Sequence, residues 1–141
     1  MILASGEVAN ERASRNSGGS VTLEQQIVVI DDEPAVLELV CDVLELEGFS
    51  VLCLDRPVDP EELWQATSPA LFLIDIMLPG TNGIDVARGL RSIDFEDTPM
   101  IAMSASMTMV RSAQASGLFA AAIPKPFDLD EMVTLVRRCT G

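Results

Sequence analysis

Short apolar runs alternate with helical repeats along most of this chain. The run Ile27-Val28-Val29-Ile30 has no polar interruption, which is typical of a strand buried on both faces of a sheet. Pro34 then stands in the first turn of a stretch whose apolar residues recur at helical spacing as far as Gly48, which predicts a helix. A second strand is predicted at 50–54. The chain therefore opens its regular part as strand, helix, strand.

The same alternation continues to the C-terminus. Further strands are predicted at 70–74, 100–103 and 120–123, and further helices at 60–66, 84–93, 109–115 and 129–138. Five strand-then-helix units predict an α/β fold, a doubly wound three-layer sandwich around a five-stranded parallel sheet. The helix at 109–115 has few apolar anchors, and a loosely packed element is a candidate for a moving part.

The first 24 residues follow a different pattern. They show no apolar period and include Ser17-Gly18-Gly19-Ser20, a composition typical of flexible segments. We therefore predict a flexible N-terminal extension or linker at 1–24 and one folded domain at 25–141. A chain of 141 residues with 48% hydrophobic residues suffices for one domain with a full core.

Charge and hydropathy exclude several classes of function. The chain carries 22 acidic against 9 basic residues, a net charge of -13, which argues against direct binding to nucleic acid. No apolar run is long enough to span a membrane, and the first residues lack the features of a signal peptide. The sequence therefore predicts a cytoplasmic protein with no membrane partner.

Histidine and cysteine usage narrows the chemistry further. The absence of histidine excludes Ser-His-Asp and Cys-His catalysis and most zinc sites. The three cysteines, Cys41, Cys53 and Cys139, lack metal-binding spacing, and their odd count predicts reduced thiols that fill apolar faces.

Polar residues stand where the predicted strands end. Asp31-Asp32-Glu33 follow the first strand, Asp75 the third, Ser104 the fourth and Lys125 the fifth. Ligands of such sheets bind at the carboxyl ends of the strands, near a switch in strand order. Clustered carboxylates repel one another unless a cation joins them, and Mg²⁺ is a hard cation with oxygen preference. A hydroxyl and an ammonium suit phosphoryl oxygens, so the set predicts phosphoryl transfer onto a carboxylate.

Four segments resemble the receiver domains of two-component response regulators. They are Val29-Ile30-Asp31-Asp32-Glu33, Leu73-Ile74-Asp75-Ile76-Met77-Leu78-Pro79-Gly80, Met103-Ser104-Ala105 and Pro124-Lys125-Pro126-Phe127. They occur in order, each at the end of the matching strand, and the resemblance covers about residues 26–141. It implies a flavodoxin-like receiver fold that takes a phosphoryl group from a histidine kinase or histidine phosphotransfer protein and switches the binding of a downstream protein.

The resemblance also implies a role for each site residue. Asp75 would accept the phosphoryl group, and Ser104 and Lys125 would contact its oxygens. The Mg²⁺ ligands would be Asp31, Asp32, Asp75 and the backbone carbonyl of Met77. A cis bond before Pro126, frequent in the family, would aim the lysine inward. Such a domain is not an enzyme in the usual sense, since it catalyses only its own phosphorylation and dephosphorylation.

One position departs from the family pattern. The Tyr or Phe that often stands three residues before the lysine is Ala122 here, the chain has no tyrosine, and Phe119 lies too far upstream to be an obvious substitute. Phosphorylation would shift a two-state equilibrium of the last two helices and the strand between them. That switch must use another device or be weak.

Several alternatives stay open on the sequence alone. Asp31 and Asp32 are also good helix caps, and Gly80 and Gly83 are expected to serve only backbone conformation. A degenerate, unphosphorylated receiver would act as an interaction module. A phosphatase of the haloacid dehalogenase type would place its nucleophile after the first strand, and a flavodoxin-like cofactor site would avoid acids there. The chain ends after its last predicted helix, so the domain works alone or belongs to a longer protein.

Overall fold

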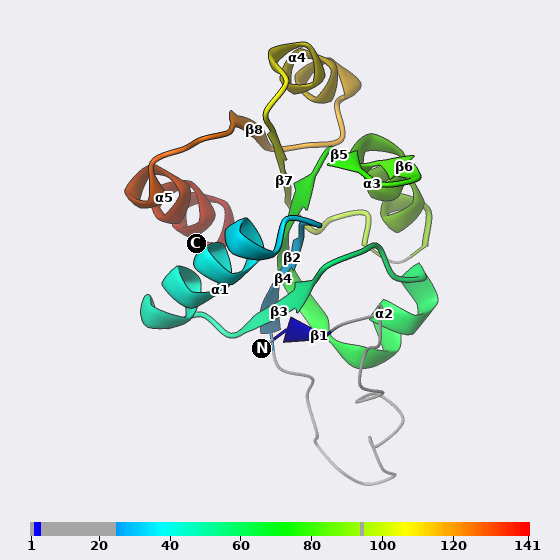
Figure 1. Cartoon of the computed structure of the whole chain (residues 1–141). Coiled ribbons are helices and arrows are strands. Elements are labelled where there is room, and N and C mark those ends of the chain that lie inside the picture. Colours follow the sequence, from blue (N-terminus) through cyan, green and yellow to red (C-terminus); the bar gives the residue numbers. More distant parts are fainter. Residues whose placement is uncertain (1, 4–24, 94) are drawn as a thin grey trace, which may run out of the picture.

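A central parallel sheet runs through the molecule with helices on both of its faces (Figure 1). The computed structural model describes residues 2–3, 25–93 and 95–141. The sheet contains β1 (Ile2–Leu3), β2 (Gln25–Ile30), β3 (Val51–Leu54), β4 (Ser68–Asp75), β7 (Met100–Ser104) and β8 (Ala121–Pro124). The helices are α1 (Pro34–Leu46), α2 (Pro60–Ala66), α3 (Gly83–Ile93), α4 (Met107–Ser116) and α5 (Leu129–Thr140). The predicted flexible extension lies outside the described residues, except for the two residues of β1.

The strand order of the sheet is β1-β3-β2-β4-β7-β8, and every pairing in it is parallel. All five predicted strands are present, so the prediction of a doubly wound α/β fold is confirmed. Two features were not predicted. The two-residue β1 pairs with the edge strand β3, and a small hairpin of β5 (Met77–Leu78) and β6 (Thr81–Asn82) follows β4.

Burial on both faces explains the uninterrupted apolar runs in the strands. The side chains of Ile27–Ile30 are at most 1% exposed, and every residue of β3 and β7 is buried. One apolar core packs β2, β3, β4 and β7 against α1 and α5, and a second packs the other face against α2 and α3. Figure 1 shows α1 and α5 on one side of the sheet and α2 and α3 on the other.

Helix termini follow the signals in the sequence. Pro34 is the first residue of α1, and Gly48 adopts φ 97° just beyond its end. The Ser106 side chain caps α4 by accepting from the N–H of Met109, and Gly117 ends this helix at φ 75°. α4 is longer than predicted because these two caps extend it at both ends. Its buried residues are Val110 and Ala113, which agrees with the expected scarcity of apolar anchors.

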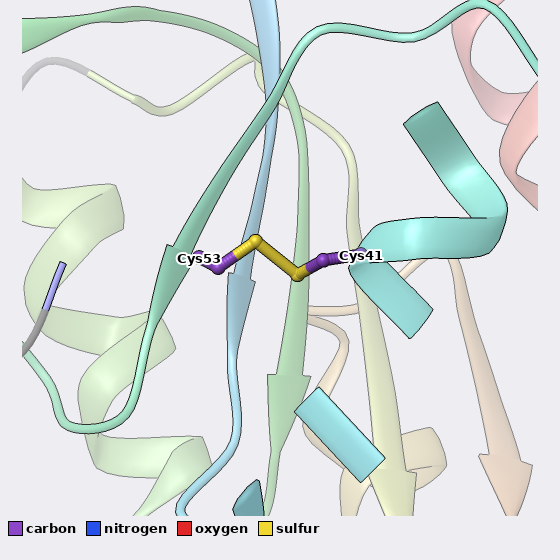
Figure 2. The surroundings of a disulfide bond; sticks show 2 residues. All are labelled: Cys41 and Cys53. Atoms are coloured by element: carbon purple, nitrogen blue, oxygen red, sulfur yellow. A yellow bond between two sulfur atoms is a disulfide. The ribbon is translucent and has the colours of Figure 1, made fainter. Parts of the chain in front are cut away.

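The expectation of three reduced cysteines is wrong for two of them. Cys41 on α1 and Cys53 on β3 form a disulfide in the buried core between helix and sheet, as Figure 2 shows. Their Cα atoms lie 6.6 Å apart, inside the range of about 4.4–6.8 Å that disulfides occupy. An odd cysteine count carries no information on which two residues meet in space. Cys139 is free and half-buried on α5.

The helices of the described segments are all too short or too polar to cross a lipid bilayer. The two apolar cores hold most of the buried hydrophobic side chains of the described residues.

Candidate functional site

The predicted site forms where the winding of the sheet reverses direction. β2 lies between β3 and β4, so the chain moves to one side of β2 and then to the other. Asp31 directly follows β2, and Asp75 ends β4 beside it. Asp31, Asp32 and Asp75 each place one carboxylate oxygen within 4.8 Å of the others. The sequence prediction that these three residues converge is thus met by the geometry.

Lys125 reaches the same cluster from the segment after β8. Its Nζ donates hydrogen bonds to Asp31 Oδ2 at 2.7 Å, Glu33 Oε1 at 2.9 Å and Asp75 Oδ2 at 3.1 Å. The side chain is only 9% exposed, and the peptide bond to Pro126 is cis, as the resemblance implied. Burial alone would lower the pKa of the Lys125 ammonium, but the hydrogen bonds to Asp31 and Glu33 and the charges of Asp31 and Asp75 outweigh it and raise that pKa.

The carboxyl group of Asp75 is held in place by two neighbours. Its Oδ1 accepts a hydrogen bond from the N–H of Met77 at 3.0 Å, while its Oδ2 accepts from Lys125. The residue is 3% exposed. Burial and the negative charge of Asp31 raise the pKa of Asp75 from 3.8 to about 6, against the opposing effect of Met77 and Lys125. At neutral pH the ionised carboxylate of Asp75 is therefore less favourable in the folded protein than in the unfolded chain.

A pH dependence of stability follows from that raised pKa. A carboxyl whose pKa is higher in the folded than in the unfolded state stabilises the fold below its unfolded pKa of 3.8, and this contribution is lost as the pH rises through about 6. In a chelating buffer we expect Asp75→Asn, which cannot ionise, to exceed the wild type in free energy of unfolding by roughly 2 kcal/mol near neutral pH. The difference should shrink toward pH 4 in urea unfolding curves, and a pH-independent difference would contradict the raised pKa.

The alternative role of the first two aspartates as helix caps is only partly met. Asp31 Oδ1 accepts from the N–H of Glu33 at 2.9 Å, which fixes the turn before α1. The N-cap residue of α1 is Glu33, whose side chain makes no capping hydrogen bond. The other oxygen of Asp31 faces the cluster and binds Lys125. Asp31 therefore orders the turn and contributes charge to the site at once.

Ser104 and Met77 lie at the site without joining the ion-pair network. Ser104 ends β7, is fully buried, and accepts a hydrogen bond on its Oγ from the N–H of Ser106 at 3.1 Å. The backbone carbonyl of Ser104 accepts a hydrogen bond from the N–H of Lys125 at 2.8 Å, which holds the backbone of Lys125 next to Ser104. Met77 lines a surface hollow together with Asp32. The contacts of Ser104 with a phosphoryl group and of the Met77 carbonyl with Mg²⁺ stay predictions.

Gly83 serves the site in a way that the sequence did not indicate. A Cβ atom on this residue would overlap the carbonyl oxygen of Asp75 and would lie 2.8 Å from the Cα of Ile76. The N–H of Gly83 donates to the carbonyl of Ile76 at 2.8 Å. Glycine is thus required for the close approach of α3 to the backbone of Asp75 and Ile76. Gly80, in contrast, adopts φ 76° and serves backbone conformation as expected.

Glu33 is the site residue whose contact was missed. The sequence places it after the first strand without indicating a partner, yet its carboxylate binds Lys125, which is 92 positions away in the sequence. The only signal was its place as the third acid of the run after β2. That run does not reveal which of its members reaches the lysine.

The oxygen donors of the cluster fit Mg²⁺. Three carboxylates converge, two of them buried, and no histidine or thiol is among them. Mg²⁺ is typically bound by one or two carboxylates together with water and phosphate oxygens. The Lys125 ammonium already occupies the position of a counter-cation between Asp31 and Asp75. Such a cluster suits a cation that shares the carboxylates with this lysine.

The missing aromatic leaves a small apolar cluster beside β8. Ala122 packs, half-buried, against Ile76, Ala102 and Ala113. Phe119 packs against the same cluster although it lies upstream of the strand. Ala122 from β8 and Phe119 from the loop before it therefore pack against the same small apolar cluster.

The chain is similar in sequence to known response regulators. The family model for the response regulator receiver domain matches residues 27–137. The DNA-binding response regulator MtrA of Mycolicibacterium smegmatis is 35% identical over 119 residues, which are 82% of this chain and 50% of MtrA. The response regulator MprA of Mycobacterium leprae is 32% identical over 115 residues, 79% of this chain and 49% of MprA.

Solved structures show the same fold. The response regulator TrrA of Thermotoga maritima, in complex with Mg²⁺-BeF, aligns at a TM-score of 0.66 and 29% identity over 82% of this chain and 98% of that one. An uncharacterised protein from Neptuniibacter caesariensis aligns at a TM-score of 0.75 and 19% identity over 82% of this chain and 87% of that one, which supports the fold alone.

The fold and the site define a flavodoxin-like α/β domain with an acidic cluster and a nearly buried lysine at the switch point of its sheet. The chain belongs to the response regulator receiver domain family and is a receiver domain of two-component signalling. It spans about half the length of the curated relatives that it matches. Family membership disfavours two of the alternatives, a phosphatase of the haloacid dehalogenase type and a flavodoxin-like cofactor-binding site.

Proposed function

We propose that the chain accepts a phosphoryl group on Asp75, and that Mg²⁺ binds at Asp31, Asp32 and Asp75. The observation that carries the proposal is the shared ammonium of Lys125, which hydrogen-bonds both Asp31 and Asp75 in a nearly buried cluster of three carboxylates. A buried arrangement of this kind is costly for a domain that only packs. It suits a site where carboxylates bind a cation and one of them receives a phosphoryl group.

In the proposed reaction a carboxylate oxygen of Asp75 attacks phosphorus as the bond to the donor breaks. With a phosphohistidine donor the P–N bond breaks and its electron pair leaves with the imidazole, so Asp75 becomes an acyl phosphate. Lys125 donates to a phosphoryl oxygen, and the Ser104 hydroxyl binds another. The N–H of Met77 keeps Asp75 oriented. Bound Mg²⁺ supplies positive charge to the carboxylates and to the phosphoryl oxygens.

The proposed donors are a histidine kinase or a histidine phosphotransfer protein, and the proposed recipient of the signal is a downstream protein. The relative TrrA, solved with Mg²⁺-BeF, supports the cation and the phosphoryl site. Relatives named DNA-binding match this chain over half of their length. The net charge of -13 is the basis for proposing that this domain itself makes no direct contact with nucleic acid.

We propose that the catalytic chemistry is limited to the phosphoryl group of the domain itself. Asp75 is both the nucleophile and the residue that carries the phosphoryl group, so each transfer modifies the domain itself. The phosphoryl group leaves Asp75 when water attacks the acyl phosphate. A cytoplasmic location stays a prediction from the sequence.

Intact-mass spectrometry tests the proposal directly. The protein is incubated with acetyl phosphate with and without Mg²⁺, next to Asp75→Asn. We expect a single phosphoryl adduct that requires both Mg²⁺ and Asp75, because the attacking oxygen belongs to Asp75 and the charge around it needs a divalent cation. Glu96→Gln, a change at an exposed acid outside the site, is the matched control and should be labelled like the wild type.

One result would favour the degenerate receiver instead. If no adduct forms and Mg²⁺ does not raise the melting temperature, the domain neither binds the cation nor accepts the phosphoryl group. It would then act only by binding a partner, and Asp75→Asn would leave that binding unchanged.

A further inference from the structure

Glu33 occupies the N-cap position of α1 but does not behave as a cap. Its side chain makes no hydrogen bond to the first turn of the helix. Its backbone N–H is already held by Asp31 Oδ1 at 2.9 Å. The carboxylate instead extends across to Lys125, where Oε1 lies 2.9 Å from Nζ. The side chain of Glu33 is 57% exposed and that of Lys125 only 9%, so Glu33 binds the lysine from the solvent side.

The hydrogen-bonding capacity of Lys125 is fully used. An ammonium group has three donors, and these are taken by Asp31, Glu33 and Asp75. A further acceptor oxygen can bind only if one of these partners gives way. Asp31 is a proposed Mg²⁺ ligand and Asp75 is the proposed phosphoacceptor. Glu33 is the one partner of Lys125 that neither the cation nor the phosphoryl group requires.

We propose that Glu33 is a positioning residue that retains Lys125 at the site while its two buried partners are exchanged. The proposal rests on the function proposed above. With Glu33 present, Lys125 keeps one fixed acceptor and can release Asp31 to the cation. Without it, the ammonium has only Asp31 and Asp75 as partners and competes with Mg²⁺ for both.

The chain offers a matched control for the charge of Glu33. Glu38 lies on the same helix, is exposed, and lines a surface hollow with Asp32. Glu38→Ala removes one negative charge near Asp32, as Glu33→Ala does next to it, but leaves every hydrogen bond of Lys125 in place. Glu33→Ala removes both charge and acceptor, whereas Glu33→Gln removes the charge and keeps an acceptor oxygen.

The first measurement is Mg²⁺ affinity by calorimetric titration of the purified protein. We expect Glu33→Ala to weaken Mg²⁺ binding about three- to fivefold, in the range of a partly exposed ion pair, with Glu33→Gln in between and Glu38→Ala close to the wild type. Equal effects of Glu33→Ala and Glu38→Ala would overturn the proposal, because the effect would then be one of general charge.

The second measurement reports on Lys125 without any cation. Lys125 is the only lysine in the sequence, so its acylation by an amine-reactive ester is read by peptide mapping and separated from the α-amino group. In a chelating buffer we expect severalfold faster labelling in Glu33→Ala than in the wild type and Glu38→Ala, because the cover on the solvent side is lost. Unchanged labelling would overturn the positioning role.

Failure of the proposed function gives a different pattern. If the wild type itself binds no Mg²⁺ and gains no phosphoryl adduct, the function fails and the inference with it. If the wild type does both but Glu33→Ala matches Glu38→Ala in both measurements, only the role of Glu33 is overturned.

Discussion

Replacing Lys125 by methionine is expected to lower the free energy of unfolding by about 3 kcal/mol at about pH 7.5 in a chelating buffer. The ammonium is the shared partner of Asp31 and Asp75, which are 0% and 3% exposed. Methionine keeps most of the packing of the alkyl chain, so the change mainly leaves buried carboxylates without a counter-charge. Urea unfolding at equilibrium measures the loss.

Three further conditions separate this cause from a loss of packing. Added Mg²⁺ should restore most of the stability, because a cation again joins the carboxylates. Adding Asp75→Asn to Lys125→Met should recover part of the loss, because one of the unpaired charges is removed. Lower pH should reduce the loss as the carboxylates take up protons.

The control for Lys125→Met is Arg111→Met, which removes the same charge from an exposed position on α4. We expect this variant to stay within about 0.5 kcal/mol of the wild type. If Lys125→Met were as stable as the wild type in the chelating buffer, the ion pairs of Lys125 with Asp31 and Asp75 would not stabilise the cation-free domain. That result would contradict the role of Lys125 as their counter-charge.

Gly83→Ala is expected to lower the free energy of unfolding by about 2–3 kcal/mol. The new methyl group would overlap the carbonyl oxygen of Asp75 and approach the Cα of Ile76 to 2.8 Å. Both contacts are with backbone, and the side chain of Ile76 is fully buried, so no rotamer change relieves them. Because Asp75 carries the proposed phosphoacceptor oxygen, labelling by acetyl phosphate should slow as well.

Gly89→Ala is the matched control for Gly83→Ala. Gly89 lies in the interior of the same helix, α3, and a Cβ there meets nothing within 4 Å. Helix propensity alone should then raise stability by about 0.5–1 kcal/mol. The two alanine variants are thus expected to differ in sign. A gain in stability for Gly83→Ala would contradict this prediction, because it would show that the backbone of Asp75 can shift to make room for the new methyl group.

The order of strands and helices could be predicted because each element carries its own periodicity. The run at 27–30 is buried on both faces, and every predicted strand joins the parallel sheet. The boundaries of α4 were harder to predict because its ends are fixed by Ser106 and Gly117 and not by apolar residues. The two-residue β1 has no periodicity that a sequence could show, since only its pairing with β3 defines it.

The candidate site divides in the same way. Asp31, Asp32 and Asp75 could be predicted to converge because the strands that precede them are parallel and end at one edge of the sheet. Lys125 could be placed at that edge by the same rule. Its three acceptors could not be predicted, because the choice depends on side-chain reach across the site.

The sequence by itself determined the fold class, the family and the residue types at the strand ends, since alternation of strands and helices and local motifs are properties of neighbouring residues. The tertiary structure decided which distant residues meet. It joined Cys41 to Cys53, bound Glu33 to Lys125, and pressed Gly83 against the backbone of Asp75. Each of these contacts depends on how α1, α3 or the segment after β8 packs against the sheet, and packing between elements leaves no periodic trace in the chain.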